Sequence, residues 1–382
     1  MRQDLLRCVK ASVEAAAKAI AKAIFRVPAA GVLWLAGAAG LCAAPFPAPF
    51  AAPFAAPIEP PQCESCHRDQ ARAQPATDMA LALVLPDSNR VLRGHPRLTF
   101  RRGIYSYEIE TRDGQSAYTV TNGKDKLSVP IRWSFGIRSQ TWVLEYHEHF
   151  YESLVSYFAP INGLDVTIGD NSIHPQTLLE AFGRELSEGE MKLCFECHAT
   201  RAVAGNRLQL QGIVPGVQCE RCHTGAERHL QSISQGKTDS TPQKLGRLSP
   251  EEISNFCGQC HRTWERVVRD RLRGEINVRF QPYRLANSKC YDGGDRRMSC
   301  IACHDPHHDI VRGAASYDAK CLACHSRAAG GAAGASANVK SCRVATGSCA
   351  NCHMPKVELP GGHMVFTDHQ IRVVRAGEPY PN

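Results

Sequence analysis

The sequence predicts an α+β fold with low regular secondary structure, and three observations lead to this prediction. The pentapeptide Cys-x-x-Cys-His occurs seven times among the 382 residues. A stretch at about 98–170 alternates between apolar and polar side chains, which is typical of a small antiparallel β element. From Thr177 onward, short helix signals alternate with loop-forming residues.

The seven pentapeptides carry the chemistry of covalent c-type haem attachment. Two thiols three positions apart add to the two vinyl groups of a haem, and the histidine directly after them ligates the iron from one face. The attachment cysteines are Cys63, Cys66, Cys194, Cys197, Cys219, Cys222, Cys257, Cys260, Cys300, Cys303, Cys321, Cys324, Cys349 and Cys352. The proximal iron ligands are His67, His198, His223, His261, His304, His325 and His353. The cofactor prediction is therefore seven covalently bound haem c groups.

Two other kinds of site also use paired cysteines. Zinc knuckles do not require a histidine directly after the second cysteine, and a disulfide framework requires no histidine at all. Seven complete pentapeptides therefore favour haem over both. The motifs use 14 of the 18 cysteines and leave Cys8, Cys42, Cys290 and Cys342. Cys290 and Cys342 either pair as a disulfide or stay free.

The spacing of the motifs bounds the kind of core that the chain can form. Six motifs lie within the 160 residues from Cys194 to His353, which is too few residues per haem for a conventional apolar core. We expect a haem-filled core, wrapped by short helices and loops and held by covalent attachment. The predicted heptahaem domain spans 63–382, and its haem-dense part spans 194–369.

The formal charge of +8 does not indicate a nucleic-acid partner. Each haem brings two propionates, so the holoprotein is expected to be near neutral or acidic. The arginines are then more simply explained as propionate counterions, because a guanidinium pairs well with a carboxylate.

The N-terminal residues predict export. Residues 1–44 join a basic flank to the uncharged run 27–44, which indicates a signal peptide or an uncleaved membrane anchor. Residues 45–62 repeat Ala, Pro and Phe and predict an extended linker. Because haem c is attached outside the cytoplasm, we expect the protein in the periplasm or at the outer cell surface, and membrane-attached if the N-terminal segment is retained.

The β element is expected between the first motif and the rest. Tyr105–Glu110 and Ala117–Val120 alternate around Asp113-Gly114, which is a hairpin signal. Trp142–Tyr146 and Leu154–Phe158 predict two more strands. We expect this element to serve as a packing platform that covers haem faces.

Two helices have clear signals. Leu178–Phe182 suits one helix, and Ser249 with Pro250 and two glutamates suits the start of another that delivers Cys257 at its end. Residues 330–337 predict a flexible loop of Gly, Ala and Ser.

Several motifs resemble those of a known family. They are Gln218–His223 with His229 six residues on, Tyr151–Tyr157 with Gly163-Leu164-Asp165, Tyr283-Arg284-Leu285 with Ser288-Lys289-Cys290, Cys300–His307 with its Asp-Pro-His ending, and Cys349–Lys356 with Thr367-Asp368-His369. This set resembles the multihaem c-type cytochromes of the cytochrome c-554 type with a doubled CXXCH motif. The resemblance implies an exported electron carrier with closely stacked haems. One departure is Thr224-Gly225-Ala226, where the family usually has Gly-Pro-Gly.

Each iron also needs a second axial ligand, which is histidine or methionine in low-spin electron-transfer haems. Nine histidines lie outside the motifs, enough for bis-histidine ligation of seven haems. The resemblance places His229 and His307 first, because both follow a motif at the family's positions. His307 is too close to His304 to reach the other face of the same haem, so we expect it to serve a neighbour and to link the two sites of Cys300–His325. The other distal candidates are His369, His363, His147, His149, His95, His174 and Met79.

For His147 with His149, and for Met79, the sequence gives a further reason to consider iron ligation. His147 and His149 are two apart on a predicted strand and would share a face, so that one could ligate an iron. Met79, in Thr77-Asp78-Met79, resembles a recurrent Thr-x-Met of the family and is a candidate for the sixth ligand of the first haem.

The favoured function is electron transfer along closely packed haems in a respiratory pathway, with other redox proteins or a quinol-oxidising membrane complex as partners. The alternative is a multihaem oxidoreductase in which one open-site haem acts on a small nitrogen or sulfur compound. Nitrite and tetrathionate reductases of this kind typically have lysine in place of one motif histidine, whereas all seven motifs here end in histidine. Hydroxylamine-oxidising relatives need a tyrosine bonded to one haem, for which Tyr105, Tyr146 and Tyr291 are candidates. The sequence predicts an electron carrier rather than an enzyme. It does not indicate an oligomeric state.

Overall fold

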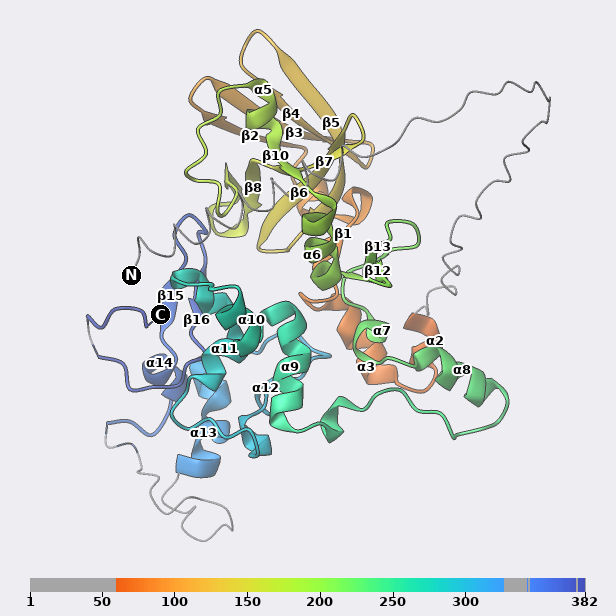
Figure 1. Ribbon diagram of the computed structural model, residues 1–382, viewed down its shortest axis with the longest axis vertical. Helices are drawn as coiled ribbons and strands as arrows, with labels where there is room; N and C mark the ends of the chain where they lie inside the picture. The colour runs from red at the N-terminus through yellow and green to blue at the C-terminus, as the bar shows by residue number, and fades with distance from the viewer. Residues whose placement is uncertain (1–59, 326–341, 343, 376, 382) are drawn as a thin grey trace, which may run out of the picture. The chain divides into compact units, whose positions relative to one another are not determined.

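The computed structural model describes residues 60–325, 342, 344–375 and 377–381 (Figure 1). The expected signal or anchor segment at 1–44, the linker as far as residue 59 and the expected loop at 330–337 lie outside the described residues. The described residues all belong to one compact unit, Phe54–Asn382. None of the helices in this described part is long and apolar enough to cross a membrane.

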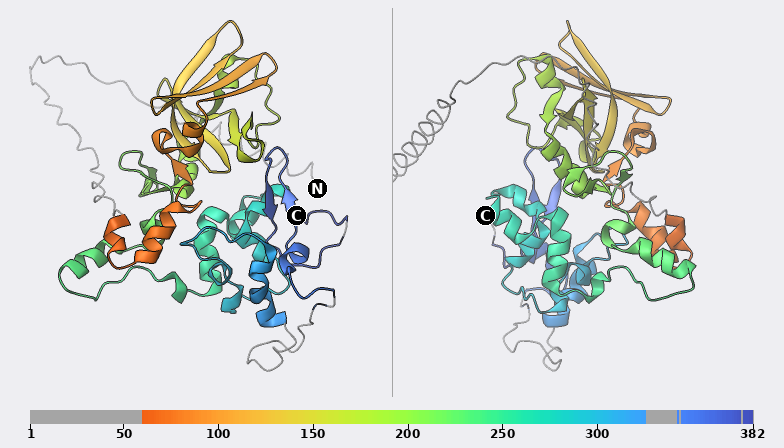
Figure 2. Two further views of the ribbon diagram at one scale, coloured as in Figure 1. Left: turned by 180° about the vertical axis from the view of Figure 1, so that it is seen from behind. Right: turned by 45° about the vertical axis from the view of Figure 1, so that its right-hand side comes forward.

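An antiparallel sheet of ten strands lies between the first and second motifs. Its main path is β10-β7-β6-β5-β4-β3-β2, while β1 pairs with β5, β8 pairs with β6, and β9 pairs with β8 (Figure 2). The strands are β1 Leu83–Val84, β2 Arg97–Arg102, β3 Tyr105–Arg112, β4 Gln115–Thr121, β5 Lys126–Phe135, β6 Ser139–Tyr146, β7 His149–Ser153, β8 Val155–Phe158, β9 Gly163–Val166 and β10 Gly183–Leu186.

The α+β class is confirmed, but the β element is larger than the sequence predicts. Strands begin before residue 98 and end after residue 170. The missed strands carry weak signals: β2 reads Arg-Leu-Thr-Phe-Arg-Arg, and its single fully buried side chain is Leu98. A strand whose exposed face is mostly charged is stabilised by its neighbours in the sheet rather than by its own propensity.

The predicted hairpin around Asp113-Gly114 is confirmed. Strands β3 and β4 pair up to Arg112 and Gln115, and both turn residues have positive φ, 51° and 77°. Such a two-residue turn matches the twist of the flanking strands.

The predicted strand that would carry both His147 and His149 is wrong. Tyr146 pairs with His149, so that His147 and Glu148 form the turn between β6 and β7, with φ of 50° and 66°. Neither turn residue is Gly, Asn or Asp, the residues that usually mark this turn, which is why the pattern hid it. The two histidines therefore do not share a strand face.

Two apolar clusters stabilise the sheet. One includes Trp142, Tyr118 and Phe182 of helix α5 (Leu178–Phe182), which are fully buried. The other includes Trp133 and Phe195 of helix α6 (Glu188–His198), whose rings meet edge to face with centroids 5.0 Å apart. Both clusters draw on residues 83–213. Among the described residues after 213, apart from prolines, the buried apolar side chains are Ile253, Val267, Val278 and Leu359. The predicted haem-dense part thus has almost no apolar core of its own.

Helix α6 and helix α9 (Pro250–His261) each begin with a capping box and end at a motif histidine. Ser187 with Glu190 caps α6, and Ser249 with Glu252 caps α9, which confirms the helix start predicted at Ser249. The predicted helix Leu178–Phe182 is also confirmed. The other helices are α2 Pro60–Glu64, α3 Arg68–Ala73, α4 Arg90–Gly94, α7 Cys219–Cys222, α8 Ala226–Ser234, α10 Trp264–Arg269, α11 Gln281–Ala286, α12 Cys300–Cys303, α13 Asp318–His325 and α14 Cys349–His353.

Three two-stranded antiparallel sheets complete the described strands. They are β11 Ala199–Thr200 with β14 Val214–Pro215, β12 Val203–Ala204 with β13 Arg207–Leu208, and β15 Lys356–Glu358 with β16 Val365–Thr367.

Candidate functional site

Every Cys-x-x-Cys-His motif lies on a helical turn. The motif is contained in α6, α9, α13 and α14, and its two cysteines begin and end α7 and α12. In the first, third and fifth motifs, the histidine amide donates to the carbonyl of the first cysteine at 2.8, 2.8 and 2.9 Å. Residues three and four apart share a helix face, so both sulfurs and the imidazole project from the same side. This is the arrangement that covalent attachment and proximal ligation require.

Hydrogen bonds orient four of the motif imidazoles. The Nδ1 atom of His198 donates to the carbonyl of Ala82 at 2.9 Å, and that of His223 to the carbonyl of Gln243 at 3.2 Å. The same atom donates from His261 to Gln281 Oε1 at 3.1 Å and from His353 to the carbonyl of Arg372 at 2.9 Å. A donor bond from Nδ1 fixes the ring and its tautomer and leaves Nε2 as the metal-binding atom.

Desolvation favours the neutral imidazole at three motif histidines and at His369. The surrounding protein lowers the pKa of His198, His261 and His304, chiefly through desolvation. Burial, followed by the nearby His304, lowers the pKa of His369 to about 4. Only the neutral imidazole has a lone pair for a metal, so these shifts favour ligation at pH 7.

Two histidines outside the motifs face a motif histidine. The rings of His307 and His223 have centroids 6.1 Å apart and planes within 5° of parallel. His307 therefore faces the third motif, and the expectation that it links the two sites of Cys300–His325 is wrong. The rings of His369 and His304 have centroids 6.2 Å apart with an interplanar angle of 45°. The Nδ1 of His307 donates to Asp305 Oδ1 at 3.1 Å, and that of His369 donates to the carbonyl of Thr367 at 3.0 Å. In both residues Nε2 makes no hydrogen bond within the described part of the chain.

The spacing of these ring pairs fits two ligands on opposite faces of one iron. Taking a metal–nitrogen bond of about 2.0 Å and about 1.1 Å from nitrogen to ring centre, two trans imidazoles have centroids about 6.2 Å apart. Aromatic rings that stack directly are in van der Waals contact and would lie closer. The residues present therefore fit a haem at the third and at the fifth motif, which His223 with His307 and His304 with His369 would hold.

The remaining distal candidates are differently placed. His229, on α8, donates from Nδ1 to the carbonyl of Ser240 at 2.8 Å. His308, which is not among these candidates, donates from Nδ1 to Asp305 Oδ2 at 2.9 Å. His95 is bonded at both ring nitrogens, to the Val91 carbonyl and to Asn162 Oδ1, and so has no free ligating atom. The Nε2 of His363 is bonded to Asp165 Oδ2 at 2.7 Å.

Four candidates lie on or near the surface. His147 and His174 are exposed, and exposed His149 is bonded to Glu185 at 2.7 Å. Met79 is half-buried. Its carbonyl accepts a hydrogen bond at 3.1 Å from the amide of Val217, a residue that lies two positions before the third motif.

Neighbouring motifs touch one another through their cysteines. Cys63 of the first motif lies near Cys219 of the third, and Cys257 of the fourth lies near Cys300 of the fifth. Cys303 of the fifth motif lies near Cys321 of the sixth, the predicted tandem pair. Cys321 and Cys349 join the sixth to the seventh, whose first helical turn is also capped by Asp318.

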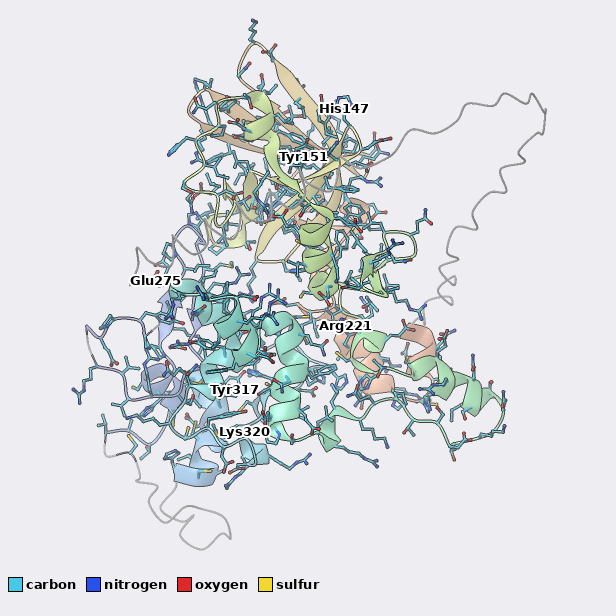
Figure 3. The ribbon with its side chains drawn as sticks, viewed as in Figure 1. His147, Tyr151, Arg221, Glu275, Tyr317 and Lys320 are labelled. Atoms are coloured by element: carbon cyan, nitrogen blue, oxygen red, sulfur yellow. The ribbon has the colours of Figure 1, made fainter. Side chains whose placement is uncertain are left out.

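Arg221 joins three motifs at one point (Figure 3). It lies inside the third motif and donates to the carbonyl of Glu196, inside the second, at 3.4 Å. It also donates to Gln259 Oε1, inside the fourth motif, at 3.3 Å. The thiol of Cys197 in turn reaches the carbonyl of Gln259 at 3.8 Å. Together these contacts place each of the seven motifs beside at least one other.

The remaining cysteines and tyrosines can also be placed. Cys290 and Cys342 are both free and exposed. Tyr105 is buried in the apolar cluster of the sheet, against which Tyr146 packs, and Tyr291 is half-buried. The tyrosine in ring contact with a motif histidine is Tyr317, whose centroid lies 5.6 Å from that of His304 (Figure 3).

The comparisons with known proteins agree with the chemistry of the motifs. Residues 173–224 match the family described as cytochrome c554 and c-prime. That segment contains the second and third motifs. The match supports a multihaem c-type cytochrome.

No curated protein sequence matches the chain. One solved structure, titled as the outer cell wall cytochrome OcwA, is similar to this chain with a TM-score of 0.29 and 14% sequence identity. The alignment covers 53% of this chain and 37% of the OcwA chain. A likeness of that degree carries no argument about fold or function.

Sequence reasoning missed the roles of Arg221, Tyr317 and the buried pair Arg284–Asp368. Arg284 and Asp368 lie within motifs that support the family resemblance, but they are 84 residues apart. Only the folded chain shows that they meet.

Proposed function

We propose that the chain is an exported c-type cytochrome with seven haems, which carries electrons along a series of closely packed haems in a respiratory pathway. The observation that carries the proposal is the connected series of seven motif turns, together with two histidine pairs spaced as trans ligands. Its partners would be other redox proteins or a quinol-oxidising membrane complex.

The residues of the chain have three tasks in this function. Cysteine pairs attach each haem, and the motif histidines, oriented through Nδ1, bind the iron from the proximal face. His307 and His369 close the distal face at the third and fifth motifs, and His229, oriented in the same way, is a third proposed distal ligand. A bound haem supplies an iron that takes up and releases one electron. Histidine on both faces leaves no position for a substrate and so favours transfer over catalysis.

The lack of an apolar core supports haem in the second half of the chain. The buried apolar side chains beyond residue 213 are few, whereas the sheet has two full clusters. Domain-sized segments that fold without such a core need another source of stability, which covalent haem would provide. We propose that the heptahaem domain spans 63–382 and that residues 1–44 direct export.

Haem counting and spin-state analysis test this proposal. Protein produced in a host that attaches haem c is analysed by intact mass and by the pyridine haemochrome assay. Seven haems per chain support the proposal, and fewer contradict the count. An EPR signal from high-spin ferric haem that nitrite or hydroxylamine shifts would favour the open-site oxidoreductase instead.

A further inference from the structure

The segment 367–372, which we call the C-terminal clip, contacts histidines that serve two different motifs. His369, which faces His304 of the fifth motif, donates from Nδ1 to the carbonyl of Thr367. His353 of the seventh motif donates from Nδ1 to the carbonyl of Arg372 at 2.9 Å, and the amide of Arg372 returns a bond to the His353 carbonyl at 3.1 Å. One short segment thus orients imidazoles at two haem positions.

A buried ion pair fixes the middle of the clip. Asp368 is fully buried, and Arg284 of α11 is 1% exposed. Nε and Nη2 of Arg284 donate to the two carboxylate oxygens of Asp368, at 2.8 Å each. Arg372 Nη1 donates to Asp368 Oδ2 at 2.5 Å, and the amide of Gln370 donates to Oδ1 at 3.0 Å. Every oxygen of this carboxylate is therefore engaged by the clip or by α11.

The guanidinium of Arg284 is itself held on several sides. Its Nη1 donates to the carbonyl of Pro381 at 2.8 Å, and Nη2 also donates to Gln370 Oε1 at 2.7 Å. The ring of Tyr380 lies 4.5 Å from the guanidinium carbon. Such a planar, many-bonded contact defines an orientation that a lysine cannot reproduce.

A buried ion pair of this kind is not explained by stability alone. Removing two charges from water costs about as much as their attraction returns, and apolar replacements are often equally stable. A bidentate pair does, however, impose a fixed geometry on the segments that carry it. Here those segments are the ones that orient His369 and His353.

We propose that Arg284, Asp368 and Arg372 are positioning residues that hold an iron ligand of the fifth motif and an iron ligand of the seventh motif through one shared ion cluster. The inference rests on the proposed haem binding. It predicts that one substitution changes two haems together, although their motif histidines, His304 and His353, are 49 residues apart in the sequence.

The test uses Asp368→Asn and Arg284→Lys in the full-length haem-loaded chain. Asp368→Asn keeps the size of the side chain and removes its charge, and Arg284→Lys keeps the charge and removes the bidentate contact. Haem content, EPR spectra of the ferric protein and potentiometric titrations are compared with those of the wild type. Asp270→Asn is the matched control, because Arg266 and Asp270 form an ion pair on the surface of α10 whose side chains are 31% and 32% exposed.

We expect Asp368→Asn to shift the g values or the spin state of two of the seven haems and to leave the other five unchanged. Arg284→Lys should shift the same two haems by less, and Asp270→Asn should shift none. Unchanged spectra and potentials in a haem-replete Asp368→Asn protein would overturn the inference. A lower urea midpoint with unchanged spectra would also overturn the inference, and so would a spectral change spread over all haems. A purely structural role of the ion cluster predicts either of these results.

Failure of the inference can be told apart from failure of the proposed function. If Asp368→Asn does not fold, the spectra of Arg284→Lys decide by the same criteria. If the wild-type chain itself carries no haem, the proposed function is wrong, whatever the variants show.

Discussion

Replacing His307 with alanine removes one proposed distal ligand and leaves every motif intact. The ring of His307 faces that of His223 at 6.1 Å with nearly parallel planes, as two trans ligands on one iron would. Without it, the iron of the third motif loses its sixth ligand and becomes high-spin. One haem of seven then changes, so about 14% of the total iron should give a high-spin ferric signal.

The neighbouring residue provides a matched control. His308 is also bonded through Nδ1 to Asp305, at 2.9 Å, but its side chain is 57% exposed, whereas that of His307 is 33% exposed. His308→Ala removes an equal volume from the same turn and should leave all haems low-spin.

Low-temperature EPR with spin quantification is the assay, on protein that is first shown to carry the full number of haems. Added imidazole should restore the low-spin spectrum of His307→Ala, because it can occupy the vacated axial position. A fully low-spin spectrum of His307→Ala would refute the assignment. Equal high-spin signals in both variants would refute the distinction between the two histidines.

Three further predictions concern the protein scaffold. In Gly216→Ala the added Cβ would lie 1.7 Å from the carbonyl oxygen of Ala80, whereas Gly212 has a similar positive φ but open space where its Cβ would lie. In urea unfolding, Gly216→Ala should therefore lose about 1–3 kcal/mol more stability than Gly212→Ala. Equal losses would contradict the clash. Burial, followed by the nearby Glu152, raises the pKa of Asp170 from 3.8 to about 6, so the contribution of this carboxyl to stability should fall as the pH rises from about 4 to 6. The stability of Asp170→Asn relative to the wild type should therefore increase over this window, leaving the variant more stable at pH 7, and an unchanged urea midpoint at pH 7 would contradict the shift. Arg284→Ala leaves the Asp368 carboxylate buried without its main partner, and this should lower the free energy of unfolding by about 3–5 kcal/mol. Arg266→Ala breaks a surface pair and should lower it by less than about 1 kcal/mol. Similar denaturation midpoints for the two variants would refute the difference.

The local parts of the fold were accessible from the sequence. The hairpin at Asp113-Gly114 and the helix that begins after Ser249 have signals confined to a few adjacent residues, and both are confirmed. The turn at His147-Glu148 has no such signal, and the pattern there wrongly predicts a continuous strand. The size of the sheet was missed for a related reason, because strands such as β2 are stabilised mainly by pairing with neighbours.

The candidate site likewise has a part that the sequence predicts and a part that only the fold shows. The attachment residues follow from the motif alone, because the thiols and the proximal histidine lie within five positions. The distal positions depend on contacts between distant segments: His307 faces His223 from 84 residues away, and His369 faces His304 from 65 residues away. The family resemblance singles out His307, but only the fold shows which motif histidine it faces. Only the fold shows, too, that both ring nitrogens of His95 are bonded, to Val91 and Asn162.

The central claim is that the chain binds seven haems and carries electrons between them. The most direct measurement combines iron and haem quantification with the EPR spectrum of the purified ferric wild-type protein. We predict seven haems per chain, all low-spin and unaffected by nitrite or hydroxylamine. Fewer than seven haems, or a high-spin signal that responds to either compound, would contradict the account.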